Sequence, residues 1–363
     1  MTSFGILQRS LKHEQNYVDR LGKAGNASGF CIYRFSPDQV PAPLLNGVVY
    51  DPSVKTWRKA QFPVPDFIYD RCFYSTDHKQ PSTVAFIHWL KNKTNATFLG
   101  YGLPGKWAIY KYLSADPFIR NYLPKTSKLQ PHTGANIINK LLNEQKKLML
   151  KPIIGSQGNG MLHITKDFHT INVRINHKGN VLHHTYDTTN SFLRFVSRIL
   201  NQRDYMAQEL LSLLDENNRP FDRRVVMKKI SKNCWSELGR AMRVGKQHSF
   251  VSNLHSGGII QNDDQIALKR SILLDADVTI TRITHKIVTL LEEAYPPLFE
   301  LGLDFGIDHS GKVWLLEVNS KPGHQILQDR IDYPALPFLY CRSLLAEKKG
   351  VKRHDETSTI EKG

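Results

Sequence analysis

The chain has 363 residues, of which 40% are hydrophobic and 23% charged, a balance typical of folded domains and not of disordered chains. This length predicts two or three compact units. No apolar run approaches the ~18 residues of a membrane span, and the N-terminal segment lacks the apolar stretch of a secretory signal. The four cysteines are far apart and form no CxxC pair, which argues against a disulfide scaffold or a zinc finger and favours a reducing cytosol.

Charge is the first positive indication of function. Lys and Arg number 49 against 33 Asp and Glu, and the net charge of +16 favours anionic partners such as nucleic acid, an anionic coat or a phosphorylated ligand. Nine basic residues lie between Arg219 and Lys246, against Asp222 and Glu237 alone. On charge alone, a solvated basic hairpin explains this segment equally well.

The first 103 residues are predicted to form a small α/β unit. Short apolar runs at Phe4–Leu7, Gly29–Tyr33 and Phe67–Tyr69 are separated by turns that contain Pro or Gly, and Phe86–Leu90 indicates a helix. The sequence Leu-Pro-Gly at 103–105 breaks the chain before the next unit.

Helices and strands alternate after this break. Helical periodicity begins at Lys106, and Asn136–Leu150 is predicted to be one amphipathic helix. Lys151–Ile154 is predicted to be a short strand that enters a glycine-rich turn. Residues 160–200 alternate as strands, with a helix from about Thr189.

Two further elements are expected in the C-terminal half. Arg224–Lys229 is predicted to be a strand, and Val278–Leu291 a long helix. Few apolar residues follow Glu347, which indicates a frayed tail.

The most informative pattern is a predicted hairpin near the C-terminus. Leu301–Ile307 and Lys312–Asn319 flank a four-residue turn. If Ile307 pairs with Lys312, Asp304 lies opposite Leu315. Because side chains alternate along a strand, one face then carries Asp304, Leu315, Glu317 and Asn319. The other face carries the expected core residues Leu303, Phe305, Trp314, Leu316 and Val318.

Converging carboxylates indicate a cation. Asp304 and Glu317 would repel each other at that range and would be costly to desolvate, and a bound cation removes the conflict. Hard oxygen ligands without nearby His or Cys favour Mg²⁺ or Mn²⁺, usually shared with nucleotide phosphates. The alternative is a polar hairpin face directed at solvent.

A glycine-rich segment follows Lys151, in the sequence KPIIGSQGNGM. Glycines let backbone N–H groups approach phosphate oxygens closely. The segment is neither a Walker A motif nor GxGxxG, and alone it is equally typical of a plain hairpin turn. Together with the carboxylate hairpin, it favours a nucleoside triphosphate.

Arginines form a third pattern. Strand alternation places Asp222 and Arg224 on one face; Arg243 and the sequence Asn-Leu-His-Ser-Gly-Gly at 253–258 follow. Guanidinium forks suit carboxylate and phosphate oxygens. For any single arginine, surface solvation is the alternative.

In this order, the motifs resemble the ATP-grasp superfamily, and most closely its YheC/YheD-type endospore coat-associated branch. The resemblance extends from about Pro65 to Leu345. It is carried by GKWxxYxxL at 105–113, KPxxGSxGxG at 151–160, FDRRVVMKK at 221–229, GRAMRVG at 239–245, SNLHSGG at 252–258 and LGLDFGIDxxGKVWLLEVNSKPG at 301–323.

The resemblance implies a role for each matched residue. The nucleotide-binding residues would be Lys106, Lys151, Gly155, Ser156, Gly158, Gly160, Gln208, Glu209, Leu211 and Asp222. The magnesium ligands would be Asp304, Glu317 and Asn319. The transferred phosphoryl group and the acyl substrate would face Arg224, Arg243 and Asn253.

The resemblance also implies an α/β fold in which two subdomains sandwich ATP behind an N-terminal pre-ATP-grasp domain. The expected bounds are 1–103 for that domain, 104–207 for the subdomain with the glycine-rich lid, 208–346 for the subdomain with the metal site, and 347–363 for the tail.

The expected activity is carboxylate–amine or carboxylate–nucleophile ligation through an acyl phosphate, with ATP and Mg²⁺ or Mn²⁺ as cofactors. The expected location is the cytoplasm with a link to the spore coat, and the acceptor could be a peptide or a coat component. The alternatives are a non-catalytic coat protein and a kinase on the same scaffold.

The residues Asp304-Phe305-Gly306 match the DFG motif of protein kinases, but no HRD or APE element accompanies them. A membrane partner is excluded, and nucleic acid is disfavoured because aromatic residues do not interleave with the basic cluster.

Overall fold

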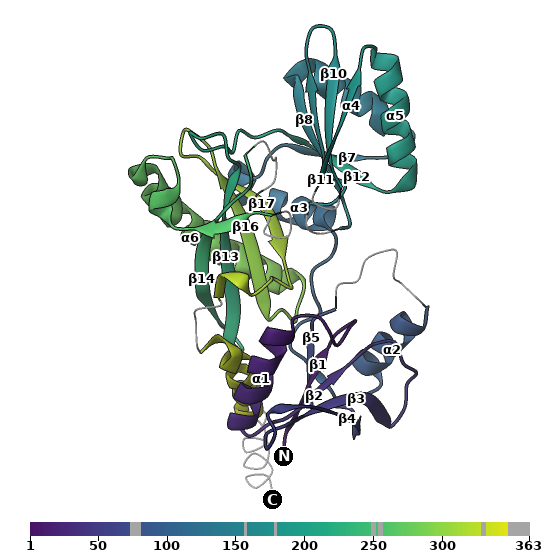
Figure 1. The fold of residues 1–363 in the computed structure, drawn as a ribbon, viewed down its shortest axis with the longest axis vertical. Coiled ribbons are helices and arrows are strands. Elements are labelled where there is room, and N and C mark those ends of the chain that lie inside the picture. Colours follow the sequence, from purple (N-terminus) through teal and green to yellow (C-terminus); the bar gives the residue numbers. More distant parts are fainter. Residues whose placement is uncertain are drawn as a thin grey trace, which may run out of the picture.

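Three sheets, each with its own helices, make up the protein in a computed structural model (Figure 1). The structure describes residues 1–72, 81–155, 158–177, 180–247, 252, 257–327 and 332–347. In Figure 1 the first sheet lies at the bottom, the third in the middle and the second at the top. No helix among the described residues is long and apolar enough to cross a membrane.

The first sheet has the strand order β4-β3-β2-β1-β5-β6, with parallel pairing from β2 to β6. Apolar residues of α1 and α2 cover opposite faces of this sheet, which confirms the α/β character predicted for this region. The elements are β1 (Ser3–Leu7), α1 (Gln15–Ala27), β2 (Cys31–Phe35), β3 (Leu44–Asp51), β4 (Thr56–Pro63), β5 (Phe67–Asp70), α2 (Pro81–Asn92) and β6 (Thr97–Phe98).

The second sheet is antiparallel, with the order β11-β10-β9-β8-β12-β7. Its two helices pack on one face over a core that includes Leu148, Ile164 and Phe192. The helices of this region leave the other face uncovered, and that face is turned toward the rest of the molecule in Figure 1. The elements are β7 (Thr126–Leu129), α4 (Gly134–Gln145), β8 (Lys147–Pro152), β9 (Leu162–Lys166), β10 (Ile171–His177), β11 (Asn180–Tyr186), α5 (Thr189–Gln202) and β12 (Tyr205–Glu209).

One helix prediction in this sheet is partly wrong. The predicted helix Asn136–Leu150 ends at Gln145, because Lys146 adopts a left-handed conformation with φ 62° and its N–H bonds back to Leu142. Beyond Lys146, Leu148 and Leu150 lie in the core as part of strand β8, while Met149 between them faces the other side of the sheet and lines the cleft. The predicted start of a helix at Thr189 is confirmed, because the Thr188 hydroxyl accepts a hydrogen bond from the N–H of Ser191.

The third sheet has the order β15-β14-β13-β16-β17 and packs against α3 and α6 around the largest core. Its central strands β13 and β16 are almost entirely buried. The elements are α3 (Lys106–Ala115), β13 (Phe221–Ser231), β14 (Cys234–Val244), β15 (Ile259–Gln261), α6 (Arg270–Ala294), β16 (Glu300–Ile307) and β17 (Val313–Asn319). Short 3-10 helices lie at Ile119–Tyr122, Asp263–Gln265, Gln325–Leu327 and Tyr333–Ala335, and residues 336–347 are helical.

The basic segment between Arg219 and Lys246 is not a solvated hairpin. Arg223 is buried between Asp263 and Asp277, and Lys228 is buried at 3.3 Å from Glu300. Further ion pairs involve Arg219, Arg224, Lys229, Lys232, Arg240 and Arg243. Most of this positive charge is therefore neutralised inside the molecule. The tail predicted from 347 onward lies outside the described residues, apart from Glu347 itself.

Candidate active site

Two carboxylates face each other on the central hairpin of the third sheet. Asp304 on β16 pairs directly with Glu317 on β17. The predicted register, with Asp304 opposite Leu315, is wrong for two reasons. Ile307 pairs with Val313 and not with Lys312, so Leu315 pairs with Phe305, and the pairing shifts again between Phe305 and Asp304. This bulge leaves Leu316 without a paired position and brings the carboxylates closer than simple alternation does.

The bulge also corrects the predicted faces of the hairpin. Leu315 is buried in the core, whereas Leu316 lines the cleft. Trp314 is not in the core either, and its indole N–H donates to Asp308 at 3.0 Å. The predicted core positions of Leu303 and Phe305 are confirmed, and Val318 packs against that core.

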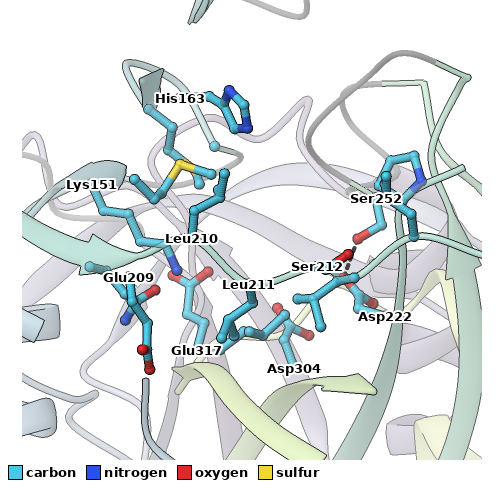
Figure 2. Close-up of a pocket in the computed structure, with 18 of the residues that line it drawn as sticks. Lys151, His163, Glu209, Leu210, Leu211, Ser212, Asp222, Ser252, Asp304 and Glu317 are labelled. Atoms are coloured by element: carbon cyan, nitrogen blue, oxygen red, sulfur yellow. Dashed lines mark hydrogen bonds between the residues drawn. The ribbon is translucent and has the colours of Figure 1, made fainter. Parts of the chain in front are cut away.

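A cleft of about 350 Å³ lies between the open face of the second sheet and this hairpin. Figure 2 shows Lys151 projecting from the second sheet toward Glu317. Nine of the predicted site residues line it, namely Lys106, Lys151, Gly158, Gln208, Glu209, Leu211, Asp222, Asp304 and Glu317. The fold therefore brings together residues that are up to about 200 positions apart in the sequence.

Two lysines approach the carboxylates from different elements. Lys106, at the N-terminus of α3, places Nζ 3.2 Å from Oε1 of Glu317. Lys151, at the end of β8, has no such close ion pair with any residue that the structure describes, and its pKa falls to about 8. Burial is the main cause and the charge of Lys106 adds to it, while Glu317 and Asp304 oppose the shift. A further anion in the cleft would therefore stabilise both ammonium groups.

Two arginines, Arg224 and Arg243, bind the carboxylate of Asp304. Arg224 donates from Nη2 to Oδ2 of Asp304 at 2.8 Å, and Nη2 of Arg243 lies 2.8 Å from Oδ1. Arg243 also forks onto Asp222 at 2.6 and 2.7 Å, and Asp222 accepts a hydrogen bond from Ser252. Burial would raise the pKa of Asp304, but the two arginines hold it below its usual value.

These arginines do not line the cleft itself; they contact it through Asp304 and Asp222. The pKa of Asp222 is raised, because its complete burial outweighs the pairing with Arg243. The pKa of Arg243 is raised by the two carboxylates despite its burial. The result is a charged layer whose groups satisfy one another beneath the cleft.

The end of β12 and the residues that follow it form one wall of the cleft. Gln208 is fixed by a 2.9 Å hydrogen bond from Nε2 to the Thr126 hydroxyl. The Glu209 carboxylate accepts the Lys125 N–H at 2.8 Å, and this hydrogen bond holds it against the start of β7. Leu211 lines the cleft as expected; Leu210, Ser212, Leu213 and Leu214 also line it, and sequence reasoning missed them.

The glycine-rich segment keeps the conformations that only glycine adopts readily. Gly155, Gly158 and Gly160 have φ of 140°, 70° and 76°. Asn176 on β10 holds Gly158 and Gly160 in place. Its side-chain Nδ2 donates to the Gly158 carbonyl at 3.1 Å, and its main-chain carbonyl accepts the Gly160 N–H at 2.7 Å. Gly158 lines the cleft, whereas Gly155 and Gly160 lie outside its lining.

Besides Gly155, Gly160 and the two arginines, three more predicted residues are not placed at the cleft. Asn319 is partly exposed, pairs with Gly302 and does not line the cleft, although it is two positions beyond Glu317 on the same strand. Ser156 and Asn253 lie outside the described residues. In the part of the chain that the structure describes, no group of three or more His, Cys, Asp or Glu could hold a metal ion, which leaves the facing pair Asp304 and Glu317 as the acidic donors.

Sequence reasoning missed the open face of the second sheet. His163 pairs with Met149 on one side and Arg174 on the other, and all three line the cleft. Burial, helped by Arg174 and Lys147, lowers the pKa of His163 to about 4, so its imidazole is neutral at physiological pH. The alternation of these residues with Leu148, Leu162 and Ile164 is a signal in the sequence that could have revealed this face.

Comparison with known proteins identifies the family of this chain. Residues 95–344 match the family described as YheC/D like ATP-grasp. The chain is 30% identical over 364 residues to the endospore coat-associated protein YheC of Bacillus subtilis (strain 168), covering 97% of this chain and 99% of that protein. It is 26% identical over 340 residues to YheD of the same organism, covering 88% of this chain and 70% of that protein.

Solved structures resemble the chain in fold. D-cycloserine synthetase DcsG superimposes with a TM-score of 0.57 at 12% identity, covering 95% of this chain and 99% of that one. The D-alanine-D-alanine ligase from Coxiella burnetii superimposes with a TM-score of 0.53 at 12% identity, covering 99% of this chain and 98% of that one. At such identities the similarity concerns the fold alone.

Proposed function

Because this chain belongs to the YheC/D-like ATP-grasp family, we propose that it is an ADP-forming ligase that activates a carboxylate with ATP in the cleft. The expected family and ATP-grasp fold are confirmed. One observation carries the proposal for the reaction: Asp304 and Glu317 face each other between two lysines and two arginines. This arrangement combines acidic metal ligands with cationic side chains that suit a triphosphate.

The nucleotide half of the proposal rests on the lining of the cleft. Lys106 and Lys151 are two of the lysines that line the cleft and offer ammonium groups to phosphate oxygens, and Gly158 contributes a tight backbone turn to the same lining. Met149 and Leu316 give the cleft apolar surface from its two sides, which suits a purine ring. The segment Glu209–Leu211 supplies backbone groups for the edge of the base. The other residues proposed to bind the nucleotide are Gln208, Asp222, Gly155, Gly160 and Ser156.

The residues present fit a magnesium ion. Asp304 and Glu317 are hard oxygen donors, and each holds a cationic side chain at contact distance, so both positions already favour positive charge. The amide oxygen of Asn319 is a third proposed donor. Mg²⁺, or Mn²⁺ in its place, would neutralise phosphate charge at this point.

The arginines serve the chemical step in this proposal. A substrate carboxylate oxygen attacks the γ-phosphorus, the bond from that phosphorus to the bridging oxygen of ADP breaks, and an acyl phosphate forms. A nucleophile then attacks the acyl carbon, phosphate leaves, and the proton of the nucleophile passes to water. Arg224 and Arg243 are held by Asp304 and Asp222, so they offer fixed positive charge to the transferring group. Asn253 is proposed to assist them.

Trapping of the activated acyl group tests the reaction class. Purified protein is incubated with ATP labelled in the γ-phosphate, Mg²⁺, pooled carboxylates and hydroxylamine. A ligase yields ADP, labelled free phosphate and a hydroxamate that appears only when a carboxylate is present. Stable transfer of label to a hydroxyl product, without hydroxamate or free phosphate, would instead identify a kinase.

A structural role at the spore coat is the second candidate. The observation that favours it is the description of both curated relatives as endospore coat-associated. We propose on this basis that the chain acts in the cytoplasm of a sporulating cell or at the coat. A purified protein that binds coat components but neither binds nor consumes ATP would support the non-catalytic alternative.

A further inference from the structure

The strand that carries Glu317 is held at its end by residues from outside the third sheet. None of the described residues before Lys106 lines the cleft. Even so, Ser320, Lys321 and Pro322, which directly follow β17, are each bonded to the N-terminal part of the chain. We call these three residues the β17 extension.

The bonds to the β17 extension come from two places. The Leu103 N–H donates to the Ser320 hydroxyl at 2.9 Å. Lys321 Nζ donates to the Cys72 carbonyl at 2.6 Å and lies 2.8 Å from Oδ2 of Asp70. Arg71 Nη2 donates to the Pro322 carbonyl at 3.1 Å. Three consecutive residues are thus fixed by the end of β5 and by the segment that leads into α3.

Arg71 is itself fixed, because it is buried and uses its whole guanidinium. It donates from Nε to Oε2 of Glu14 at 3.1 Å, and it pairs through Nη1 with Glu300 at 2.5 Å. Glu300 also accepts the Tyr69 hydroxyl at 2.7 Å and lies 3.3 Å from Lys228. A buried arginine with this many partners is a rigid anchor, because each displacement would leave a buried polar group unpaired.

Two partners of Arg71, Glu300 and Pro322, flank the two strands that carry Asp304 and Glu317. Glu300 begins β16, four residues before Asp304, and Pro322 follows β17, five residues after Glu317. Gly302 and Asn319 pair between them. A Cβ atom on Gly302 would lie 2.8 Å from both Arg224 and Pro322, so the backbone packs closely against both residues at this end of the hairpin.

We propose that Arg71 and Lys321 are positioning residues that set the placement of Glu317 against Asp304 by holding the β17 extension to the first sheet. This inference rests on the proposed Mg²⁺-dependent ATP site. Its physical reason is that metal and phosphate binding require donors placed to within a fraction of an ångström, and a displacement of ~1 Å costs about 100-fold in rate. The first sheet thereby influences a cleft that its described residues do not line.

Two variants of the β17 extension test the proposal without removing the buried arginine. Lys321→Met keeps the apolar stem but removes the bonds to Cys72 and Asp70. Ser320→Ala removes the acceptor of the Leu103 N–H. Lys286→Met is the matched control, because it removes a lysine–aspartate pair, at 3.4 Å from Asp116, that lies away from the extension.

The first readout is amide hydrogen exchange across residues 313–324 without nucleotide. Faster exchange in Lys321→Met and Ser320→Ala, with the rest of the third sheet and the control unchanged, is the expected result. Exchange as slow as in the unmodified protein would overturn the proposal. This readout does not depend on whether the cleft binds ATP.

The second readout is Mg²⁺ titration of ATP binding. Both variants should need about tenfold more Mg²⁺, the lower end of what lost support around a metal ligand costs, while ATP binding without Mg²⁺ stays unchanged. Looser exchange combined with an unchanged Mg²⁺ requirement would show that the extension does not position Glu317. If the unmodified protein shows no Mg²⁺-dependent ATP binding, the proposed function fails, and exchange alone decides whether the extension is held.

Discussion

The two sides of the cleft differ in how their charged side chains are stabilised. On the side of the third sheet, Asp304 and Asp222 line the cleft and pair with Arg224 and Arg243 beneath it, so opposite charges neutralise one another there. On the wall of the second sheet, the pKa of Lys151 falls to about 8 and that of His163 to about 4, because burial and neighbouring cations both disfavour the positive form. One wall is neutralised in advance, and the other gains stability when an anion arrives.

This difference assigns separate tasks to the walls. Fixed charges that need no rearrangement suit stabilisation of a transferring phosphoryl group. Destabilised cations suit ligand binding, since a polyanion relieves the repulsion between them. Substitutions on the third-sheet wall should therefore affect turnover most, and substitutions on the second-sheet wall should affect ATP affinity.

The largest effect is expected for Arg224→Ala. Loss of one fixed donor commonly lowers the rate about 10²–10³-fold, and ATP affinity should change much less. The fold should persist, because Arg243 still pairs with Asp304. Steady-state turnover and direct ATP binding check this prediction; a variant with intact turnover and weakened ATP binding would reverse the proposed roles of the walls.

Arg243→Ala should damage stability as well as turnover. It leaves Asp222 and Asp304 buried with fewer partners, and breaking a buried ion pair from one side costs about 3–5 kcal/mol. Denaturant unfolding at pH 7 measures this loss. An unfolding free energy equal to that of the unmodified protein would show that Arg243 is not a part of the pre-neutralised layer.

Lys151→Met should weaken ATP binding about 10–100-fold, the range expected for one charge-assisted hydrogen bond. The same variant should be more stable than the unmodified protein without nucleotide at pH 7, because a charged lysine whose pKa is depressed by burial opposes folding there. Calorimetric titration and thermal unfolding measure the two effects. Loss of stability would contradict the account of a destabilised cation.

A pH dependence follows from the same lysine. The folded pKa of Lys151, about 8, lies below its ordinary value of 10.5, so the folded protein binds fewer protons than the unfolded chain between these pH values. Stability contributed by this residue therefore rises with pH across that window, while the affinity for ATP falls as Lys151 loses its proton. In Lys151→Met the pH dependence of ATP affinity should disappear, and its persistence would assign it to another group. The rise in stability should only become smaller, because the pKa of Lys229 is also lowered to about 8.

The smallest effect is expected for His163→Gln. Because the imidazole is neutral above a pKa of about 4, glutamine preserves its charge state and its hydrogen-bonding character. ATP affinity should change by less than about threefold, with the same pH profile between 5 and 8. A pH dependence that vanishes in this variant would mean that His163 is charged in solution.

Much of this architecture was predictable from the sequence. The order of motifs identified the family, and strand alternation correctly indicated that Asp304 and Glu317 converge. The bulge at Leu316 was not predictable, because one extra residue in a strand leaves the apolar pattern nearly unchanged while it reverses the faces of Leu315 and Leu316.

Two other features depend on tertiary structure. The left-handed Lys146 ends α4 inside a continuous helical pattern, and only the packing of Leu148 and Leu150 in a sheet decides against a longer helix. The role of Arg71 was not predictable for a different reason: its partners Glu14, Glu300 and Pro322 are distant in the sequence, and no motif links them to Arg71.

Glu317→Gln tests the central claim most directly, because it keeps side-chain volume and removes one of the two facing carboxylate charges. ATP affinity is measured as a function of Mg²⁺ concentration in both proteins, with circular dichroism as the check on folding. The account predicts that the unmodified protein binds ATP more tightly as Mg²⁺ rises and that the folded variant loses this response. A folded Glu317→Gln protein with the same Mg²⁺-dependent affinity would contradict the claim that the hairpin is the metal–nucleotide site.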